Sequence, residues 1–254
     1  MKILFIGDIV GKMGRQAVNQ YLPSLKKQHQ IDFVIANAEN SAHGKGITAK
    51  IYHQLLSYGI DFMTLGNHAF SKADVEKIIE EPKIIRPLNL DNATGGRGYR
   101  VVDFLGISIL IANICGTVFM DQVTISPFEA IEPVLKEKAD IKILDFHGEA
   151  TSEKIAFAFH YGKYFNAILG THTHVQTADE RIINGCAFIS DVGMTGPYQS
   201  VLGRDTTEVL KQLVAKEKTH YTISENPAVF SAVIIEIDDN YQTKNISRIQ
   251  IRPE

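Results

Sequence analysis

Short apolar runs alternate with longer amphipathic segments along most of the chain. The short runs are rich in isoleucine, valine and phenylalanine and are bounded by glycine or polar residues, which is typical of β-strands. The predicted strands cover residues 2–7, 33–38, 62–65, 99–104, 107–113, 141–146, 167–170, 186–190, 228–237 and 245–252. Strands that alternate with helical segments predict an α/β fold built in layers.

Helical periodicity separates many of these strands. The predicted helices cover residues 14–28, 49–58, 72–80, 127–138, 152–161 and 204–216. Thr48 and Ser71 are expected to cap the second and third helices, because their side-chain oxygens can accept a hydrogen bond from a free backbone N–H. Pro23 is expected to kink the first helix or to end it early, since proline has no backbone N–H to donate.

Two hairpins indicate that part of the architecture is antiparallel. Strands 99–104 and 107–113 are separated only by Leu105 and Gly106, and the last two strands are separated by a turn at Asp239-Asn240. The chain has no fixed-period repeat, low-complexity segment or Pro/Gly/Ser-rich linker. We therefore expect residues 1–254 to form a single domain.

Composition and charge narrow the class of protein. The chain is 44% hydrophobic and 22% charged, as globular proteins usually are. Its formal net charge of -3 argues against extended duplex nucleic acid as a partner, because such proteins usually carry a basic face. Cys115 and Cys186 are predicted to be buried, reduced thiols. The apolar stretches are too short for a membrane helix or a signal-peptide core, so we expect a cytoplasmic protein without membrane contact.

Polar residues that can bind metal ions follow five of the predicted strands, at their carboxyl ends. They are Asp8, Glu39 and Asn40, Asn67 and His68, His147, and His172 with His174. Ligands of open α/β sheets bind beyond the carboxyl ends of the strands, so these residues are expected to converge. Nitrogen and oxygen donors without cysteine favour iron or manganese, with zinc and magnesium as alternatives.

The spacing of these residues also suggests their directions. In an extended chain, residues two apart point the same way, so His172 and His174 are expected to face one metal cluster. Asn67 and His68 are adjacent and should diverge, with one on the metal and the other toward the substrate or the leaving group. A single histidine after a strand is more often structural, and Asp8 alone could be a helix cap. The whole set, at five strand ends, is better explained by a metal site.

Two of these segments also match known motifs. Gly66-Asn67-His68 resembles the GNH core of calcineurin-like metallophosphoesterases, and residues 170–174 resemble their terminal G-x-H motif. Together with residues 7–11, 37–41, 145–147 and 171–179, the set resembles the YmdB family of that superfamily, over nearly the whole chain. The resemblance implies a β-sandwich core flanked by helices, a binuclear metal site, self-association, and phosphodiesterase activity on substrates such as 2′,3′-cyclic AMP.

The sequence departs from the wider superfamily at two motifs. The usual D-x-H opening reads Asp8-Ile9-Val10, and the usual GD reads Ala38-Glu39. By resemblance, one metal ion is held by Asp8, Glu39, Asn40 and His174, and the other by Glu39, Asn67, His147 and His172. Two carboxylates against two divalent cations leave an excess of about two positive charges, which suits a phosphate diester.

The predicted reaction is in-line attack on phosphorus by a hydroxide that bridges two metal ions, with His68 protonating the leaving alkoxide. Two alternatives stay open: a phosphomonoesterase with the same site, and a regulatory protein whose metal ions support little catalysis. The glycines of residues 7–13 lack the P-loop spacing, which argues against ATP binding. Arg15 is interpreted as structural, whereas His43 and residues 191–197 are candidates for the pocket lining.

Overall fold

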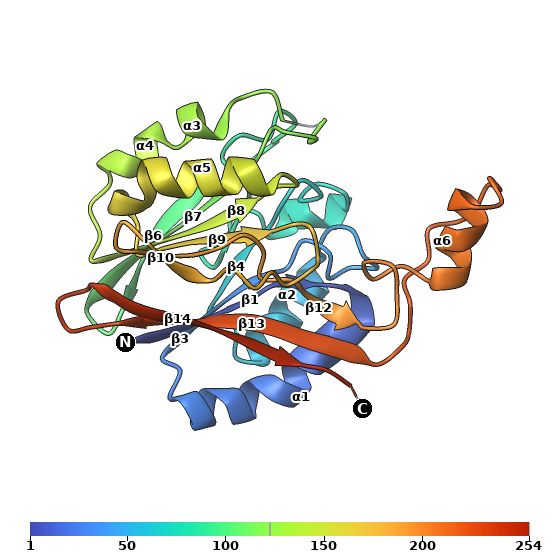
Figure 1. Ribbon diagram of the computed structural model, residues 1–254, viewed down its shortest axis with the longest axis horizontal. Coiled ribbons are helices and arrows are strands. Elements are labelled where there is room, and N and C mark those ends of the chain that lie inside the picture. Colours follow the sequence, from blue (N-terminus) through green and yellow to red (C-terminus); the bar gives the residue numbers. More distant parts are fainter. Residues whose placement is uncertain (122, 254) are drawn as a thin grey trace.

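The computed structural model describes residues 1–121 and 123–253. Two β-sheets pack against each other, and helices lie on their outer faces (Figure 1). The helices α3, α4 and α5 lie beside one sheet and α1 lies beside the other, whereas α6 projects from the body of the molecule. The predicted layered α/β fold is therefore confirmed.

The first sheet combines strands from both ends of the chain. Its order is β2-β12-β13-β1-β3-β4-β5, and β14 pairs with β13. The bounds are β1 Lys2–Ile6, β2 Asp8–Ile9, β3 Phe33–Asn37, β4 Phe62–Thr64, β5 Ile84–Ile85, β12 Met194–Pro197, β13 Ala228–Ile237 and β14 Thr243–Ile251. Strands β1, β3, β4 and β5 are parallel, whereas β13 is antiparallel to β1. The carboxyl ends of β1, β3 and β4 therefore lie at the same end of the sheet.

The second sheet has the order β10-β11-β9-β8-β7-β6. The bounds are β6 Tyr99–Phe104, β7 Ile107–Cys115, β8 Ile141–His147, β9 Ala167–Thr171, β10 Arg181–Ile183 and β11 Cys186–Ile189. Strands β7, β8, β9 and β11 are parallel, which brings the carboxyl ends of β8 and β9 together. Strands β6 and β7 form the predicted hairpin, turned at Leu105 and Gly106, both of which have positive φ.

Six α-helices and two 3₁₀ helices are found in the described residues. They are α1 Gly11–His29, α2 Ala49–Ser57, α3 Pro127–Ala130, α4 Glu132–Lys136, α5 Thr151–Tyr161, α6 Thr206–Leu213, η1 Ala73–Lys77 and η2 Gly162–Tyr164. Thr48 caps α2 as predicted, because its side chain accepts a hydrogen bond from the backbone N–H of Ile51. Among these residues, no helix is long and apolar enough to span a membrane.

Three helix predictions were wrong in part. Helix α1 continues past Pro23 to His29, because the carbonyl of Asn19 that loses its partner lies on the exposed side of the helix. The helix predicted for residues 72–80 is a short 3₁₀ turn, and Lys72 rather than Ser71 occupies its N-cap position. The helix predicted for residues 127–138 is divided into α3 and α4, since Pro133 cannot donate to the preceding turn.

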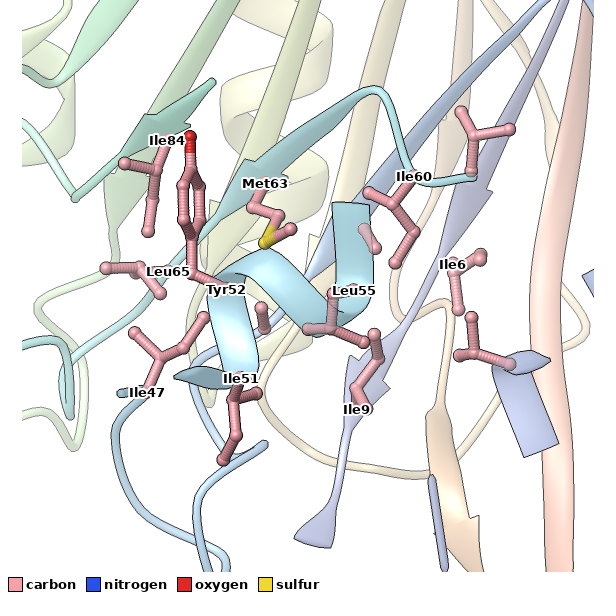
Figure 2. Packing of buried hydrophobic residues seen from close by; sticks show 14 of the residues in the cluster. Ile6, Ile9, Ile47, Ile51, Tyr52, Leu55, Ile60, Met63, Leu65 and Ile84 are labelled. Carbon is pink, nitrogen blue, oxygen red and sulfur yellow. The ribbon is translucent and has the colours of Figure 1, made fainter. Parts of the chain in front are cut away.

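Three hydrophobic clusters hold the layers together. The central one lies between the sheets and joins, for example, Phe5 and Ile35 of the first sheet to Ile143 and Leu169 of the second. A second packs α5 against the outer face of the second sheet. The third lies under α1 and α2. Within it, Tyr52 and Leu55 of α2 pack among residues of β1 and β4 such as Ile6 and Met63 (Figure 2).

These layers fix the positions of the strand ends on which the candidate site is built. Cys115 and Cys186 are both free and buried, as predicted.

Candidate metal centre

Polar side chains from both sheets meet beyond the carboxyl ends of the parallel strands. In chain order they are Asp8 at the start of β2, Glu39 and Asn40 after β3, Asn67 and His68 after β4, His147 at the end of β8, and His172 and His174 after β9. The residues at the strand ends are buried or half-buried. Seven of these eight side chains form two groups, each centred on one histidine.

Three side chains gather around one nitrogen of a fourth, His147. Its Nε2 atom lies 3.1 Å from Oε1 of Glu39 and 3.0 Å from Oδ1 of Asn67. The Nδ1 atom of His172 lies 3.1 Å from the same nitrogen. Ligand atoms of Glu39, His147 and His172 are all within 4.8 Å of one another, close enough to share one metal ion. We call these four residues the His147 group.

The second group surrounds His174. Its Nε2 atom lies 3.3 Å from Oδ1 of Asn40 and 3.9 Å from Oδ1 of Asp8. Its Nδ1 atom lies 3.0 Å from the carbonyl oxygen of Leu202 and donates to it, which leaves a lone pair on Nε2. The amide of Asn40 donates to the carbonyl of Gly44 at 2.9 Å, so its oxygen is held toward the histidine. We call Asp8, Asn40 and His174 the His174 group.

The hydrogen bonds of the other two histidines show which ring nitrogens are left for a cation. Thr171 donates its one hydroxyl proton to Asp145 at 2.6 Å, so Thr171 can only accept from Nδ1 of His147 at 2.9 Å. Nε2 of His172 lies 3.2 Å from a carboxylate oxygen of Glu149. The remaining nitrogens, Nε2 of His147 and Nδ1 of His172, face each other at 3.1 Å. Histidines that bind metals are commonly fixed in this way by a second hydrogen bond.

The carboxylate of Asp8 provides a test of whether the site fits a cation. Its Oδ1 atom is buried and has no hydrogen-bond partner among the residues that the structure describes. Its Oδ2 atom accepts from the backbone N–H of His172 at 3.2 Å. A buried carboxylate oxygen without a partner is costly unless a cation neutralises it. Together with the facing ring nitrogens of the His147 group, this oxygen makes the residues a good fit for metal ions.

The charges of the site are strongly coupled. Burial raises the pKa of Asp8 to about 6, against the attraction of His174 and His147. Burial alone would lower the pKa of His147, but Glu39 and neighbouring carboxylates outweigh it and raise the pKa to about 9. Burial alone would raise the pKa of Glu39, but the neighbouring His147 and His68 outweigh burial and lower this pKa to about 2. A metal ion that binds to the His147 group therefore has to displace a proton from this ion pair.

The backbone after β9 differs from the extended chain predicted for it. His172 and His174 have φ values of 99° and 66°, in the region that L residues rarely adopt. The argument from alternating side chains was therefore wrong, although both imidazoles do reach the site. His172 joins the His147 group and His174 joins the other group, because the backbone bends at His172 and Thr173.

A buried ion pair supports these two histidines. Lys154 of α5 is fully buried, and its Nζ atom donates to the carbonyl of Thr171 at 2.9 Å and to Oδ2 of Asp191 at 3.1 Å. Asp191 in turn accepts from the backbone N–H groups of Thr173 at 2.9 Å and Gly193 at 2.8 Å. The pair thus holds the backbone on both sides of His172. Residues 191–197 are buried, and among the described residues they line neither the cavity beside His43 nor the one beside Asn67, so their role as pocket lining stays a prediction.

Asp145 forms a second support beneath the site. Its Oδ2 atom accepts from Asn37 of β3 at 2.9 Å and from Thr64 of β4 at 2.5 Å, and its Oδ1 atom accepts from Thr171 of β9. This one carboxylate therefore connects the two sheets and, through Thr171, orients His147. Sequence reasoning missed the roles of Lys154 and Asp145; the available signal was a charged residue inside an otherwise apolar strand or helix face.

Gly66 and the turn that follows it shape the Asn67 side of the site. A Cβ atom at Gly66 would lie 2.2 Å from Oε2 of Glu39 and 2.4 Å from Nε2 of His147, so only glycine fits there. Asn67 and His68 lie in a turn rather than in the extended chain on which their predicted divergence was based. The backbone N–H of His68 donates to Oε2 of Glu39 at 3.0 Å, and its imidazole is half-buried.

The two remaining candidates lie apart from these groups. The guanidinium of Arg15 donates to the carbonyl of Ser41 and, at 3.0 Å, to Gln54, so it braces the loop after β3 against α2. His43 is exposed and lines a cavity of about 320 Å³ beside Gly11 and Tyr221, which contains none of the candidate ligands. Arg15 is thus structural, as interpreted, and His43 does not contact the centre.

Comparison with known proteins agrees with this arrangement of residues. The model of the YmdB-like protein family matches residues 4–249. The chain belongs to this family. A YmdB-like relative from Bacillus subtilis (strain 168) is named as a 2′,3′-cyclic-nucleotide 2′-phosphodiesterase. It is 42% identical over 255 residues, which cover 98% of this chain and 96% of the relative.

Solved structures show that the YmdB-like fold is shared. A structure described as a novel phosphatase, from Mycoplasma pneumoniae, is 38% identical with a TM-score of 0.94, and the match covers 99% of this chain and 93% of that one. A hypothetical protein from Thermus thermophilus is 36% identical with a TM-score of 0.93, and the match covers 99% of both chains. These relatives confirm the predicted family, and this YmdB-like chain is a phosphoesterase.

Proposed function

We propose that this chain is a binuclear metal-dependent phosphodiesterase that hydrolyses small cyclic nucleotides, of which the 2′,3′-cyclic nucleotides are the leading candidates. The observation that carries the proposal is the convergence of two histidine-centred groups of nitrogen and oxygen atoms at the ends of two packed sheets. The activity named for the Bacillus subtilis relative supports the choice of substrate.

We assign Asp8, Glu39, Asn40 and His174 to one metal ion, and Glu39, Asn67, His147 and His172 to the other. The distances within the two groups support this division. Glu39 is assigned to both ions because it contacts His147 directly and is also near enough to Asp8 to raise the pKa of that carboxyl. The donors are nitrogen and oxygen only, which favours iron or manganese.

Metal ions bound here would supply an activated water as the nucleophile and would stabilise negative charge on the phosphoryl oxygens. The ligand side chains set the net charge of the centre, which makes the binding of an anionic substrate favourable. Asp8 and Glu39 are the only two carboxylates among the seven assigned ligands, so two dications would keep an excess of about two positive charges. An anionic diester is then attracted to the centre. The buried Lys154–Asp191 pair and Asp145 keep the ligands in place.

His68 is assigned as the general acid that protonates the leaving alkoxide. Its backbone N–H is tied to Glu39, which fixes the residue beside the metal ligands. Within the described part of the chain, no hydrogen bond engages its imidazole, so the ring is available to a leaving-group oxygen. Proton donation of this kind matters most when the leaving group is a poor one, such as a ribose hydroxyl.

The experiment that tests the proposal begins with protein purified without added metal. Elemental analysis is expected to find about two metal ions per chain. The same preparation is then assayed with 2′,3′-cyclic and 3′,5′-cyclic nucleotides and with nucleoside monophosphates. Faster turnover of a cyclic diester supports the proposal, whereas faster turnover of monoesters would make the enzyme a phosphomonoesterase. Two bound ions without hydrolysis of either class would indicate a regulatory protein.

A further inference from the structure

A small cavity opens directly beside the His147 group. It has a volume of about 170 Å³ and is lined by Asn67, Phe119, Met120, Asp121 and His172. Two of these residues, Asn67 and His172, are assigned as metal ligands, so whatever occupies the cavity is next to the reacting phosphate. Pockets that enclose a whole drug-sized ligand start at roughly 300 Å³. This cavity therefore suits one ring system of a ligand whose charged part lies over the metal centre.

Phe119 stands out among the lining residues. Its side chain is 82% exposed, although the candidate metal ligands beside it are buried or half-buried. Its φ of 62° is in the left-handed region, and the backbone N–H of Met120 donates to the carbonyl of Thr117 at 3.2 Å, which closes a turn around it. Glycine or asparagine is usual at such a position. A turn alone therefore does not explain a phenylalanine here, which points to a role for the ring.

The turn is firmly attached to the protein body. The carboxylate of Glu153 in α5 accepts from the backbone N–H of Thr117 at 3.0 Å, from its hydroxyl at 2.9 Å, and from the N–H of Val118 at 3.3 Å. Met120, which follows Phe119, is buried. The aromatic ring is therefore presented to solvent from a fixed base. A ring held in advance loses little conformational freedom when a flat ligand stacks on it.

We propose that Phe119 stacks on the nucleobase of the substrate and makes the enzyme select cyclic nucleotides over cyclic diesters that have no base. This inference rests on the proposed function. An exposed aromatic face next to a cationic centre suits a ligand with an anionic phosphate and a flat apolar ring. Asp121 lines the same cavity and can accept a hydrogen bond from an exocyclic amino group of the base.

The test compares two substrates that share the five-membered cyclic phosphate. One is 2′,3′-cyclic AMP, and the other is methyl riboside 2,3-cyclic phosphate, which has no base. Phe119→Asn removes the ring while tolerating the left-handed backbone, and Phe119→Tyr keeps an aromatic ring. The matched control is Phe159→Asn, since Phe159 of α5 is also exposed, at 59%, and does not line the cavity. Metal content is measured for every variant.

Phe119→Asn is expected to raise KM for the nucleotide by about 5- to 100-fold, the effect usual for losing one stacked base, and to leave the base-free diester unchanged. Phe119→Tyr and Phe159→Asn are expected to behave like the unaltered enzyme with both substrates. Equal effects of Phe119→Asn on the two substrates, or no effect on the nucleotide, would overturn the stacking role of Phe119. Neither result would contradict the proposed function. If the unaltered enzyme hydrolyses neither diester, the proposed function itself fails.

Discussion

The Nζ atom of Lys154 lies 3.1 Å from Oδ2 of Asp191, and both side chains are completely buried. Between them they hold the backbone of Thr171 and Thr173, on either side of His172. Buried ion pairs contribute little net stability, because desolvation offsets their attraction, but removing one partner leaves an uncompensated charge. The position of this pair indicates that its main effect is on the conformation of the loop after β9, which carries His172 and His174.

Lys154→Met is therefore expected to lower the free energy of unfolding by roughly 3–5 kcal/mol, since Asp191 is left charged and unpaired. The double variant Lys154→Met/Asp191→Asn should recover much of this loss, because neither charge remains. It should still bind less metal than the unaltered protein, as the loop has lost its charged contacts. Urea unfolding and elemental analysis measure the two effects. Full metal content in the double variant would show that the pair does not position the loop.

Glu39→Gln is expected to lose far more metal than Asn40→Ala. Glu39 is assigned to both ions, and a neutral amide cannot replace its charge, whereas Asn40 is assigned to one ion and is neutral already. Metal content of the two purified variants, measured side by side, tests the assignment. Equal losses would show that Glu39 does not bridge the ions.

Removal of the metal ions is expected to abolish activity and to leave most of the fold intact. The three hydrophobic clusters do not depend on the centre, so the helical circular dichroism signal should persist. The unfolding temperature should fall, because ions bound only to the native state stabilise it by mass action, by about 2.7 kcal/mol at 100 times the dissociation constant. A general loss of helical signal on chelation would instead indicate a structural role for the metal.

His68→Ala is expected to retain both ions and to slow the hydrolysis of a cyclic nucleotide by roughly 10² to 10⁴-fold, as the loss of a general acid usually does. A nitrophenyl diester should be affected much less, because its leaving group needs little protonation. Kinetics and metal analysis are done on the same samples. The general-acid role is wrong if the variant keeps its metal and slows both substrates equally.

Gly66→Ala is expected to disrupt the centre with little effect on the rest of the fold. The new methyl group would lie 2.2 Å from Glu39 and 2.4 Å from His147, so one of these ligands has to move. Gly106→Ala is the control, because its Cβ meets nothing within 4 Å and only adds strain at a φ of 85°. Metal content should fall in the first variant and stay normal in the second; normal content in both would contradict the geometry described for Gly66.

The sequence was sufficient to predict much of the fold and where the polar residues meet. Long apolar runs such as β3 and β8 identify buried strands by composition alone, and the carboxyl ends of parallel strands converge whatever the details of the fold. The short strands β2, β5, β10 and β12 were missed because two to four residues carry no measurable periodicity. The order of strands depends on long-range pairs, such as β13 between β1 and β12, which no local pattern encodes.

Details of the site depended on contacts that are remote in sequence. His172 and His174 have left-handed conformations, and Lys154 and Asp191 hold the backbone on both sides of His172; spacing along the chain gives no indication of either feature. The turn at Asn67 likewise replaced the extended chain that was expected. Residue types alone could indicate that histidines and carboxylates gather, but their orientation is set by buried groups from other elements.

The pairing of β2 has a consequence for the order of events when the protein is made. Asp8 is synthesised before the other candidate donors, yet its strand pairs with β12, where Met194 is its partner. The remaining donors extend from Glu39 to His174, and they belong to two sheets. A nascent chain therefore carries an incomplete set of candidate ligands until His174 has been translated. We therefore expect metal loading to follow the synthesis of His174, and a chain that terminates before this residue to retain fewer ions.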